Sequence, residues 1–287
     1  MKLKTLFSTL ALSLVAIIAV AAHANEGPEI KYVGVTADRT DSESLQRGAR
    51  LFVNYCLNCH SAQYMRYNRL TDLQLTEDQI KKNLMFTTDK IGDTMKVAIN
   101  PKDAKEWFGA APPDLSVMAR SYTTEKLAGY LRSFYEDDKR DTGWNNLVSP
   151  NIGMPHVLHE LAGINKLVET RYKADGKEIH TDHDAEAKAL AAFVAAQTMA
   201  SFEHHADKKD GKIENSYIVR TVVNATPGKL SASEYDVAIA DLVNFMDYMA
   251  EPHKAKRIQI GILMLFLLAF LLAAAIWMKQ EFWKDIH

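Results

Sequence analysis

The sequence predicts an all-α protein with long loops, anchored by one C-terminal transmembrane helix. Apolar residues recur at helical spacing in several stretches of the 287-residue chain, and two capping-box patterns mark helix starts. No convincing alternation of apolar and polar residues indicates a large sheet. A run of 19 residues without a charge, Ile260 to Met278, is long enough as a helix to cross a bilayer once.

Composition and charge narrow the classes of function. Hydrophobic residues make up 47% of the chain and charged residues 24%, which supports one medium-sized core and excludes a disordered or fibrous protein. The formal net charge is −2, so nucleic acid is not an expected partner. Only two cysteines are present, so neither a disulfide framework nor a four-thiolate metal site can form within the chain.

The N-terminus has the pattern of a secretory signal peptide, residues 1–24. Met-Lys-Leu-Lys is followed by an uncharged apolar stretch from Leu6 to Ala22 and then by Ala22-His23-Ala24, a small-x-small cleavage pattern. Asn25 would then begin the mature chain, and the domain of residues 25–253 would be exported. An uncleaved N-terminal anchor is the alternative, and it implies the same export.

Helices are predicted along the exported domain from caps and apolar stripes. The first begins at Asp41 or Ser42, and Gly48 on it would let a neighbouring element come close. Its apolar face carries Leu45, Ala49, Phe52 and Tyr55. Further helices are predicted to begin at two capping boxes, at a threonine cap and in an Ala-rich stretch, namely at Thr76, at Ser231, at Thr123 or Thr124, and over residues 184–205.

Loops and polar segments separate these helices. Two Pro- and Gly-bearing stretches, residues 100–114 and 141–155, are predicted as loops. Residues 173–184 and 207–228 flank the Ala-rich helix and are predicted as polar, less ordered excursions.

The C-terminal segment is predicted to cross the membrane over residues 254–279. Trp277, Phe282 and Trp283 are aromatic anchors for the far interface, but basic residues lie on both sides and do not settle the orientation. Export of the domain settles it, because the tail of residues 280–287 then stays in the cytoplasm. A buried helix of a soluble core is the alternative.

The chemistry is predicted from one pentapeptide. Cys56-Leu57-Asn58-Cys59-His60 is a C-x-x-C-H pattern, in which two thiols add to the vinyl groups of a haem and the adjacent imidazole reaches the iron. A thioredoxin-like thiol pair is the main alternative, but it usually follows a strand, and here an amphipathic helix precedes it. A zinc site would need ligands from elsewhere in the chain.

A methionine is the expected ligand on the opposite face of the haem, because Met/His ligation raises the potential of an electron carrier. Met154 is the candidate, since Gly153 and Pro155 flank it in a loop and can hold an extended backbone there. The residues that remain as alternatives are Met85, Met95, Met118, His156 and His159.

Four motifs in order resemble cytochrome c1, the haem c subunit of the bacterial ubiquinol:cytochrome c oxidoreductase, or bc1 complex. They are the pentapeptide at Cys56–His60, Ala-Pro-Pro-Asp-Leu-Ser at Ala111–Ser116, Asn-Ile-Gly-Met-Pro at Asn151–Pro155, and Met-Ala-Glu-Pro at Met249–Pro252 before a single span. The closing residues 279–285 resemble the bacterial branch of the family. The resemblance covers the mature chain in outline.

The resemblance implies a cytochrome c-like haem domain with one covalent haem c. It implies that Met154 is the axial ligand opposite His60, that Pro112 and Pro113 pack on the haem, and that Arg120 pairs with a haem propionate. A guanidinium suits a partly buried carboxylate, although a solvated surface arginine is the alternative for Arg120. The implied location is the bacterial inner membrane, with one span in the lipid bilayer and the haem domain in the periplasm.

The function implied is electron transfer. Single electrons would pass from the Rieske iron–sulfur protein to a soluble or tethered periplasmic cytochrome c, with cytochrome b beside the membrane helix. Such a subunit performs no bond chemistry and is not an enzyme on its own. A membrane-tethered cytochrome c that donates to a terminal oxidase is the alternative. The stretch from about residue 164 to residue 227 is longer than a minimal cytochrome c1 would need, and we expect it to form an insertion.

Overall fold

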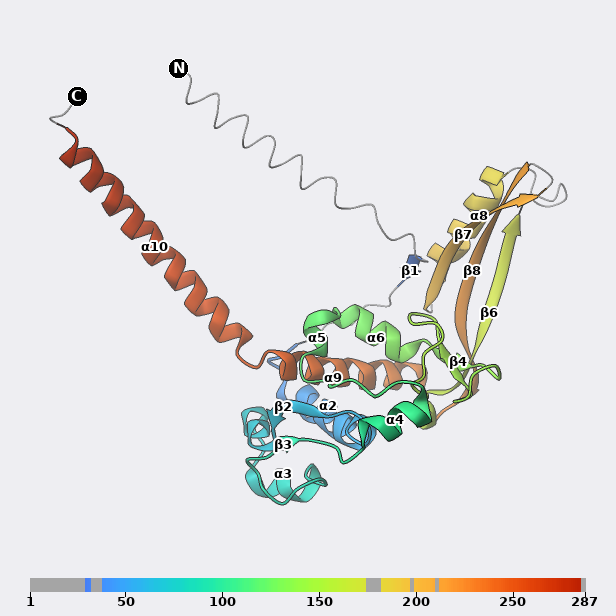
Figure 1. Ribbon diagram of the computed structural model, residues 1–287, viewed down its shortest axis with the longest axis horizontal. Helices are drawn as coiled ribbons and strands as arrows, with labels where there is room; N and C mark the ends of the chain where they lie inside the picture. The colour runs from blue at the N-terminus through green and yellow to red at the C-terminus, as the bar shows by residue number, and fades with distance from the viewer. Residues whose placement is uncertain (1–28, 32–37, 174–181, 197–198, 210–211, 285–287) are drawn as a thin grey trace.

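A helical body, a projecting β-arm and one long C-terminal helix make up the fold (Figure 1). The computed structural model describes residues 29–31, 38–173, 182–196, 199–209 and 212–284. The predicted signal peptide and the last three residues of the predicted tail lie outside this described part.

The body carries most of the helices and two small sheets. Its helical elements are α2 (Ser42–Leu51), η1 (Phe52–Cys56), η2 (Tyr67–Leu73), α3 (Glu77–Asn83), α4 (Pro101–Phe108), α5 (Met118–Ser121), α6 (Thr124–Arg132), α7 (His159–Ala162) and α9 (Ala232–Ala250). Its strands are β2 (Ala62–Arg66), β3 (Thr94–Met95), β4 (Phe134–Glu136) and β5 (Trp144–Asn146). Each of these two strand pairs is antiparallel.

Several predicted helix starts are confirmed. The carboxylate of Asp41 caps α2 by accepting a hydrogen bond from the backbone N–H of Ser44 at 3.0 Å. Both predicted capping boxes form, at the N-termini of α3 and α9. Thr123 caps α6 by accepting a hydrogen bond of 3.2 Å from the backbone N–H of Lys126, without a capping box. Each of these caps involves residues within one helical turn, so it could be predicted from a short stretch of sequence.

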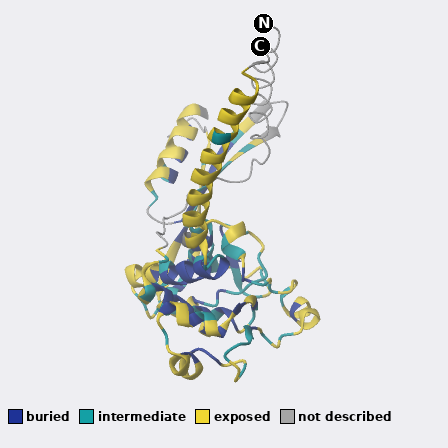
Figure 2. Cartoon of the chain, turned by 90° about the vertical axis from the view of Figure 1, so that its left-hand side faces the viewer, coloured by how far each residue is buried: buried dark blue, intermediate teal, exposed yellow. Residues whose placement is uncertain are grey.

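The centre of the body is the contact between α2 and α9. A Cβ atom added at Gly48 would lie 2.0 Å from the backbone oxygen of Asp241, so the two helices meet backbone to backbone at this point. Beside it, Arg47 donates two hydrogen bonds of 2.6 and 3.0 Å to the buried Asp241 carboxylate. Figure 2 shows the buried residues gathered in this body.

The prediction of an all-α fold is wrong, because the protein is mixed α/β with three antiparallel sheets in its described part. The largest sheet has the order β1-β7-β8-β6. With α8 it forms the arm, built from β6 (Gly163–Lys173), α8 (Asp182–Ala195), β7 (Ala200–Lys209) and β8 (Lys212–Pro227), with β1 (Glu29–Lys31) at one edge. The Ala-rich helix therefore ends at Ala195, and the stretch 207–228 is mostly strand.

Strand β8 was not predicted, because its middle part is buried on both faces. Residues 216–219 are buried in succession, so no alternation of apolar and polar residues marks the strand. Tyr217 and Val219 pack against α8, whereas Val222 packs with Leu147 and Met199 on the other side. Polar residues are exposed along the neighbouring strands, and their number led to the prediction of polar, less ordered segments in this region.

Ion pairs hold the strands of the arm together. Arg220 on β8 donates to Glu169 on β6 at 2.8 Å and to Glu203 on β7 at 2.5 Å. The hydrogen bond from Arg220 lowers the pKa of the Glu203 carboxyl, and burial opposes this effect only in part. The arm is thus cross-linked across three strands.

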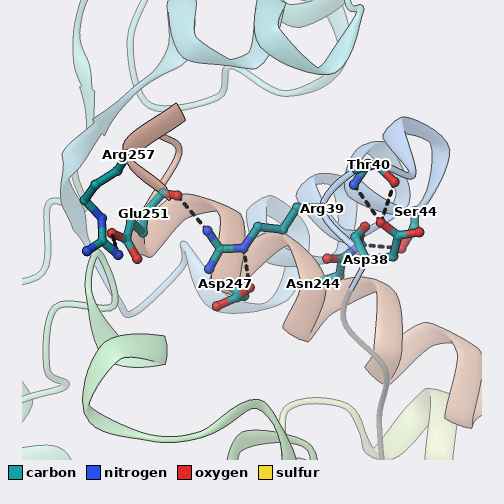
Figure 3. Close-up of polar contacts among 8 residues, drawn as sticks. All are labelled: Asp38, Arg39, Thr40, Ser44, Asn244, Asp247, Glu251 and Arg257. Carbon is teal, nitrogen blue, oxygen red and sulfur yellow. Dashed lines mark hydrogen bonds and ion pairs between the residues drawn. The ribbon is translucent and has the colours of Figure 1, made fainter. Parts of the chain in front are cut away.

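Polar contacts tie the segment before α2 to the junction of α9 and α10 (Figure 3). The guanidinium of Arg39 pairs with Asp247 and donates to the backbone oxygen of Glu251 at 2.7 Å. The Glu251 carboxylate in turn pairs with Arg257 on α10 at 2.6 Å. These contacts connect the body to the first turn of the C-terminal helix.

The C-terminal helix α10 (Lys254–Phe282) confirms the predicted helix and extends it by one turn. Within its segment Lys256–Phe282, an 18-residue window has a mean hydropathy of 2.8, and none of that window is buried against the part of the chain that the structure describes. Figure 2 shows it exposed along its length. An apolar helix of this length with no protein cover is a candidate membrane span.

Candidate haem site

The C-x-x-C-H residues are delivered by an irregular end of α2. This helix continues into η1, a π-helical turn that ends on Cys56. The backbone oxygen of Cys56 then accepts hydrogen bonds from the N–H groups of Cys59 at 3.1 Å and His60 at 2.9 Å. One tight turn therefore brings the two thiols and the imidazole together.

The ring of His60 is held in the orientation of a metal ligand. Its Nδ1 lies 2.7 Å from the backbone oxygen of Pro113. With Nδ1–H donating to this carbonyl, Nε2 keeps its lone pair for a metal. Burial lowers the pKa of His60, which favours the neutral imidazole that binds iron. Pro113 thus has a contact with His60 that the sequence did not predict.

A cavity of about 380 Å³ adjoins this turn. Apolar and aromatic side chains form most of its wall, as in sites that bury a flat cofactor. Five of the seven predicted site residues line it, namely Cys59, His60, Pro112, Pro113 and Met154. Cys56 is buried next to it in the same turn. Arg120 on α5 is exposed and does not line the cavity.

The cavity reduces the number of candidates for the second axial ligand. Met118, Met154 and Met246 line it. Of the alternatives from the sequence, Met85, Met95, His156 and His159 do not line it, whereas Met118 does. Met246 on α9 belongs to the buried core, and it lines the cavity as well. The role of Met154 stays a prediction.

The loop around Met154 is pressed against the end of α4. A Cβ atom on Gly153 would lie 2.2 Å from the backbone oxygen of Phe108, a residue that also lines the cavity. Only glycine allows this approach without a shift of the backbone. The predicted role of Gly153 as a small neighbour of Met154 therefore has a definite structural reason.

His156 packs behind the cavity. Its ring stacks on Phe134 with centroids 5.0 Å apart and meets Trp144 edge-on at 5.2 Å. Burial, together with the nearby His159, lowers the pKa of His156 to about 4, so the ring is neutral at physiological pH. It acts as an aromatic core residue that supports the loop after Met154.

Sequence reasoning missed three lining residues on and near α6. The hydroxyl of Tyr130 donates a hydrogen bond to the sulfur of Met154 at 3.2 Å. The ammonium of Lys126 lies 4.3 Å from the ring centroid of Tyr122. Among the lining residues that the structure describes, Lys126 is the one lysine or arginine. Lys126 and Tyr130 are four residues apart on one helix, so the spacing was visible, but which face met the site was not.

The site does not suit thiol redox chemistry. Burial raises the pKa of the Cys56 thiol to about 12, and the neighbouring Cys59 adds to the effect. A thiol oxidoreductase needs a thiolate at neutral pH, which this environment opposes. The residues present fit a haem, because His60 offers Nε2, three thioethers face the same cavity, and the wall is apolar.

The site has two cysteines and a histidine in a C-x-x-C-H turn beside an apolar cavity that three methionines line. The body that holds it continues into a helix of membrane length. These features define a c-type cytochrome with a candidate membrane anchor. Comparison with known proteins specifies the family. The sequence model of the Cytochrome C1 family matches residues 33–209. The chain belongs to the cytochrome c1 family.

The chain is similar to three relatives over most of their length, and two of them are cytochromes c1. The chain is 38% identical over 263 residues to the ammonia monooxygenase gamma subunit of Nitrosomonas europaea, which covers 92% of both chains. It is 37% identical over 252 residues to cytochrome c1 of Allochromatium vinosum, covering 87% of both. Cytochrome c1 of Rhodospirillum rubrum is 26% identical over 299 residues, covering 96% of both.

Membership of the family fixes the broad role. The chain is a bc1-type electron-transfer haem subunit of a respiratory chain and carries one covalently attached haem c. Bound haem supplies one-electron redox chemistry. The side chains of the site hold and orient that group.

Proposed function

We propose that this chain passes single electrons from the Rieske iron–sulfur protein to a periplasmic c-type cytochrome, as the haem c subunit of a quinol:cytochrome c oxidoreductase. Cytochrome b would lie beside its membrane helix. The observation that carries the proposal is the cavity lined by both His60 and Met154. Two protein ligands leave no open position on the iron, so the site supports outer-sphere electron transfer and opposes peroxidase chemistry.

Each site residue has a proposed role. Cys56 and Cys59 form the two thioether bonds, and His60 and Met154 are the axial ligands. Pro112 and Pro113 pack on the haem. The hydrogen bond between His60 and the Pro113 carbonyl supports this arrangement, because a hydrogen bond at one ring nitrogen of a histidine orients the other nitrogen toward the metal.

A cation is expected at the haem propionates. Arg120 is the residue implied by the resemblance to the family, and its exposed position on α5 would require it to reach the edge of the haem from outside the cavity. Lys126 already lines the cavity and has an ammonium that can compensate a carboxylate. We therefore propose Lys126 as a second candidate for this role.

The topology of the chain is also part of the proposal. Residues 1–24 would be removed on export, residues 25–253 would form the periplasmic domain, and the arm would be its insertion at about 164–227. Residues 254–279 would span the bacterial inner membrane, leaving 280–287 in the cytoplasm. The exposed apolar helix α10 supports a single span.

Isolation of the chain through an affinity tag, after mild detergent extraction of its native membranes, tests the proposal. A reduced-minus-oxidised spectrum should contain b-type and c-type bands together, and added quinol should reduce the c-type band. Oxidised cytochrome c should then reoxidise that band. If only a c-type band appears while other membrane complexes stay intact, the chain is a tethered carrier that serves a terminal oxidase.

A further inference from the structure

We propose that Tyr130 raises the redox potential of the haem by donating a hydrogen bond to the sulfur of Met154. The hydroxyl oxygen of Tyr130 lies 3.2 Å from that sulfur. The inference rests on the proposed role of Met154 as an axial ligand. Tyr130 is a positioning and tuning residue in this proposal, since it acts on the iron through the methionine.

The tyrosine ring is held in place from several sides. Its ring meets Phe134 edge-on with centroids 5.1 Å apart. Its backbone oxygen accepts a hydrogen bond of 2.8 Å from the side-chain amide of Asn146 on β5. The Asn146 side chain also accepts from Ser133 at 3.1 Å and is fully buried. The position of the hydroxyl is therefore fixed by the fold, as tuning of a ligand requires.

The sulfur of a methionine can serve two partners at once. A thioether has two lone pairs, so one can bind iron while the other accepts a hydrogen bond. A donor at the second lone pair withdraws electron density from the sulfur. A thioether is a soft ligand that binds ferrous iron more strongly than ferric iron, because it accepts electron density from the metal. A hydrogen-bond donor at the sulfur increases this acceptance, so it favours the reduced state and raises the potential.

Tyr130→Phe in the haem-loaded chain within its membrane complex tests the proposal. The variant removes the hydroxyl and keeps the ring packed on Phe134. A redox titration of the c-type band should give a lower midpoint potential. Loss of a hydrogen bond of ordinary strength should lower the equilibrium constant for reduction by about fivefold. For a one-electron couple this is about 40 mV, at about 59 mV per tenfold change.

Tyr135→Phe is the matched control. Tyr135 is also partly buried, but it packs against a different cluster and does not line the cavity. Its replacement should leave the midpoint potential unchanged. If Tyr130→Phe keeps the haem and the wild-type potential, or if the two variants shift the potential equally, the proposed hydrogen bond has no tuning role.

The ferric spectrum separates this inference from the proposed ligand set. A sulfur-to-iron charge-transfer band should persist in Tyr130→Phe and vanish in Met154→Leu. If the band persists in Met154→Leu, Met154 is not the ligand and the inference fails with it. If the band vanishes in Met154→Leu while Tyr130→Phe leaves the potential unchanged, the ligand assignment stands and only the role of Tyr130 is refuted.

Discussion

Replacing Gly153 with alanine is expected to displace the Met154 loop and to lower the midpoint potential of the haem. The added Cβ would lie 2.2 Å from the backbone oxygen of Phe108, whereas ordinary contact begins at 3.4 Å. The loop or the end of α4 must therefore move by about 1.2 Å. Both partners at this contact are backbone, so no flexible side chain can absorb the shift.

The strain of this displacement can be passed along the loop to the Met154 side chain. Overpacking of a well-packed contact typically costs about 1–3 kcal/mol. The loop can relieve this strain by drawing the Met154 sulfur away from the iron. Weaker ligation stabilises ferrous haem less, so the potential falls. The ferric charge-transfer band should weaken at the same time.

A redox titration and a ferric spectrum of the purified complex measure both effects. Gly92→Ala is the control, because a Cβ atom at Gly92 would have no neighbour within 4 Å. If Gly153→Ala keeps the wild-type potential and the full band, the contact with Phe108 does not position Met154.

Three other predictions concern the core, the haem attachment and the propionate cation. Gly48→Ala should lower the free energy of unfolding by about 1–3 kcal/mol in a denaturant titration, because its Cβ would lie 2.0 Å from the backbone of α9; an unchanged midpoint would contradict the close contact. Cys56→Ala combined with Cys59→Ala should abolish covalent haem, and haem staining of a denaturing gel should show no band. Lys126→Gln should lower the potential more than Arg120→Gln does, because Lys126 lines the cavity and Arg120 does not. A larger shift for Arg120→Gln would assign the propionate role to the arginine.

The helices could be predicted because their signals are local. The cap at Asp41 and both capping boxes need only residues within one turn, and each has the predicted hydrogen bonds. Gly48 was predicted as a point of close approach for the same reason. The partner helix, α9, could not be identified, because nearly two hundred residues separate it from α2 in the sequence.

The arm could not be predicted from periodicity. Its central strand is buried on both faces at Tyr217 and Ile218, so the alternating pattern is absent where it was expected. One local signal was available. Lys209 pairs with Lys212 across the hairpin, and the dipeptide between them is Asp-Gly, which is typical of a two-residue β-turn.

Some residues of the site could be predicted from local sequence, whereas others are brought to the site only by contacts between distant parts of the chain. The spacing of Cys56, Cys59 and His60 identifies haem attachment without any knowledge of the fold. The contribution of Tyr130 required the tertiary structure, because only the packing of α6 against the Met154 loop brings its hydroxyl to the sulfur. Tertiary contacts also showed that Lys126 lines the cavity while Arg120 does not.

The ligand pair proposed for the haem is His60 and Met154, which line the same cavity. Ferric absorption spectra of three variants, Met154→Leu, Met118→Leu and Met246→Leu, test it most directly, since these three methionines line the cavity. We expect the sulfur-to-iron charge-transfer band to vanish only in Met154→Leu. A band that persists in Met154→Leu and vanishes in either of the other variants would contradict it.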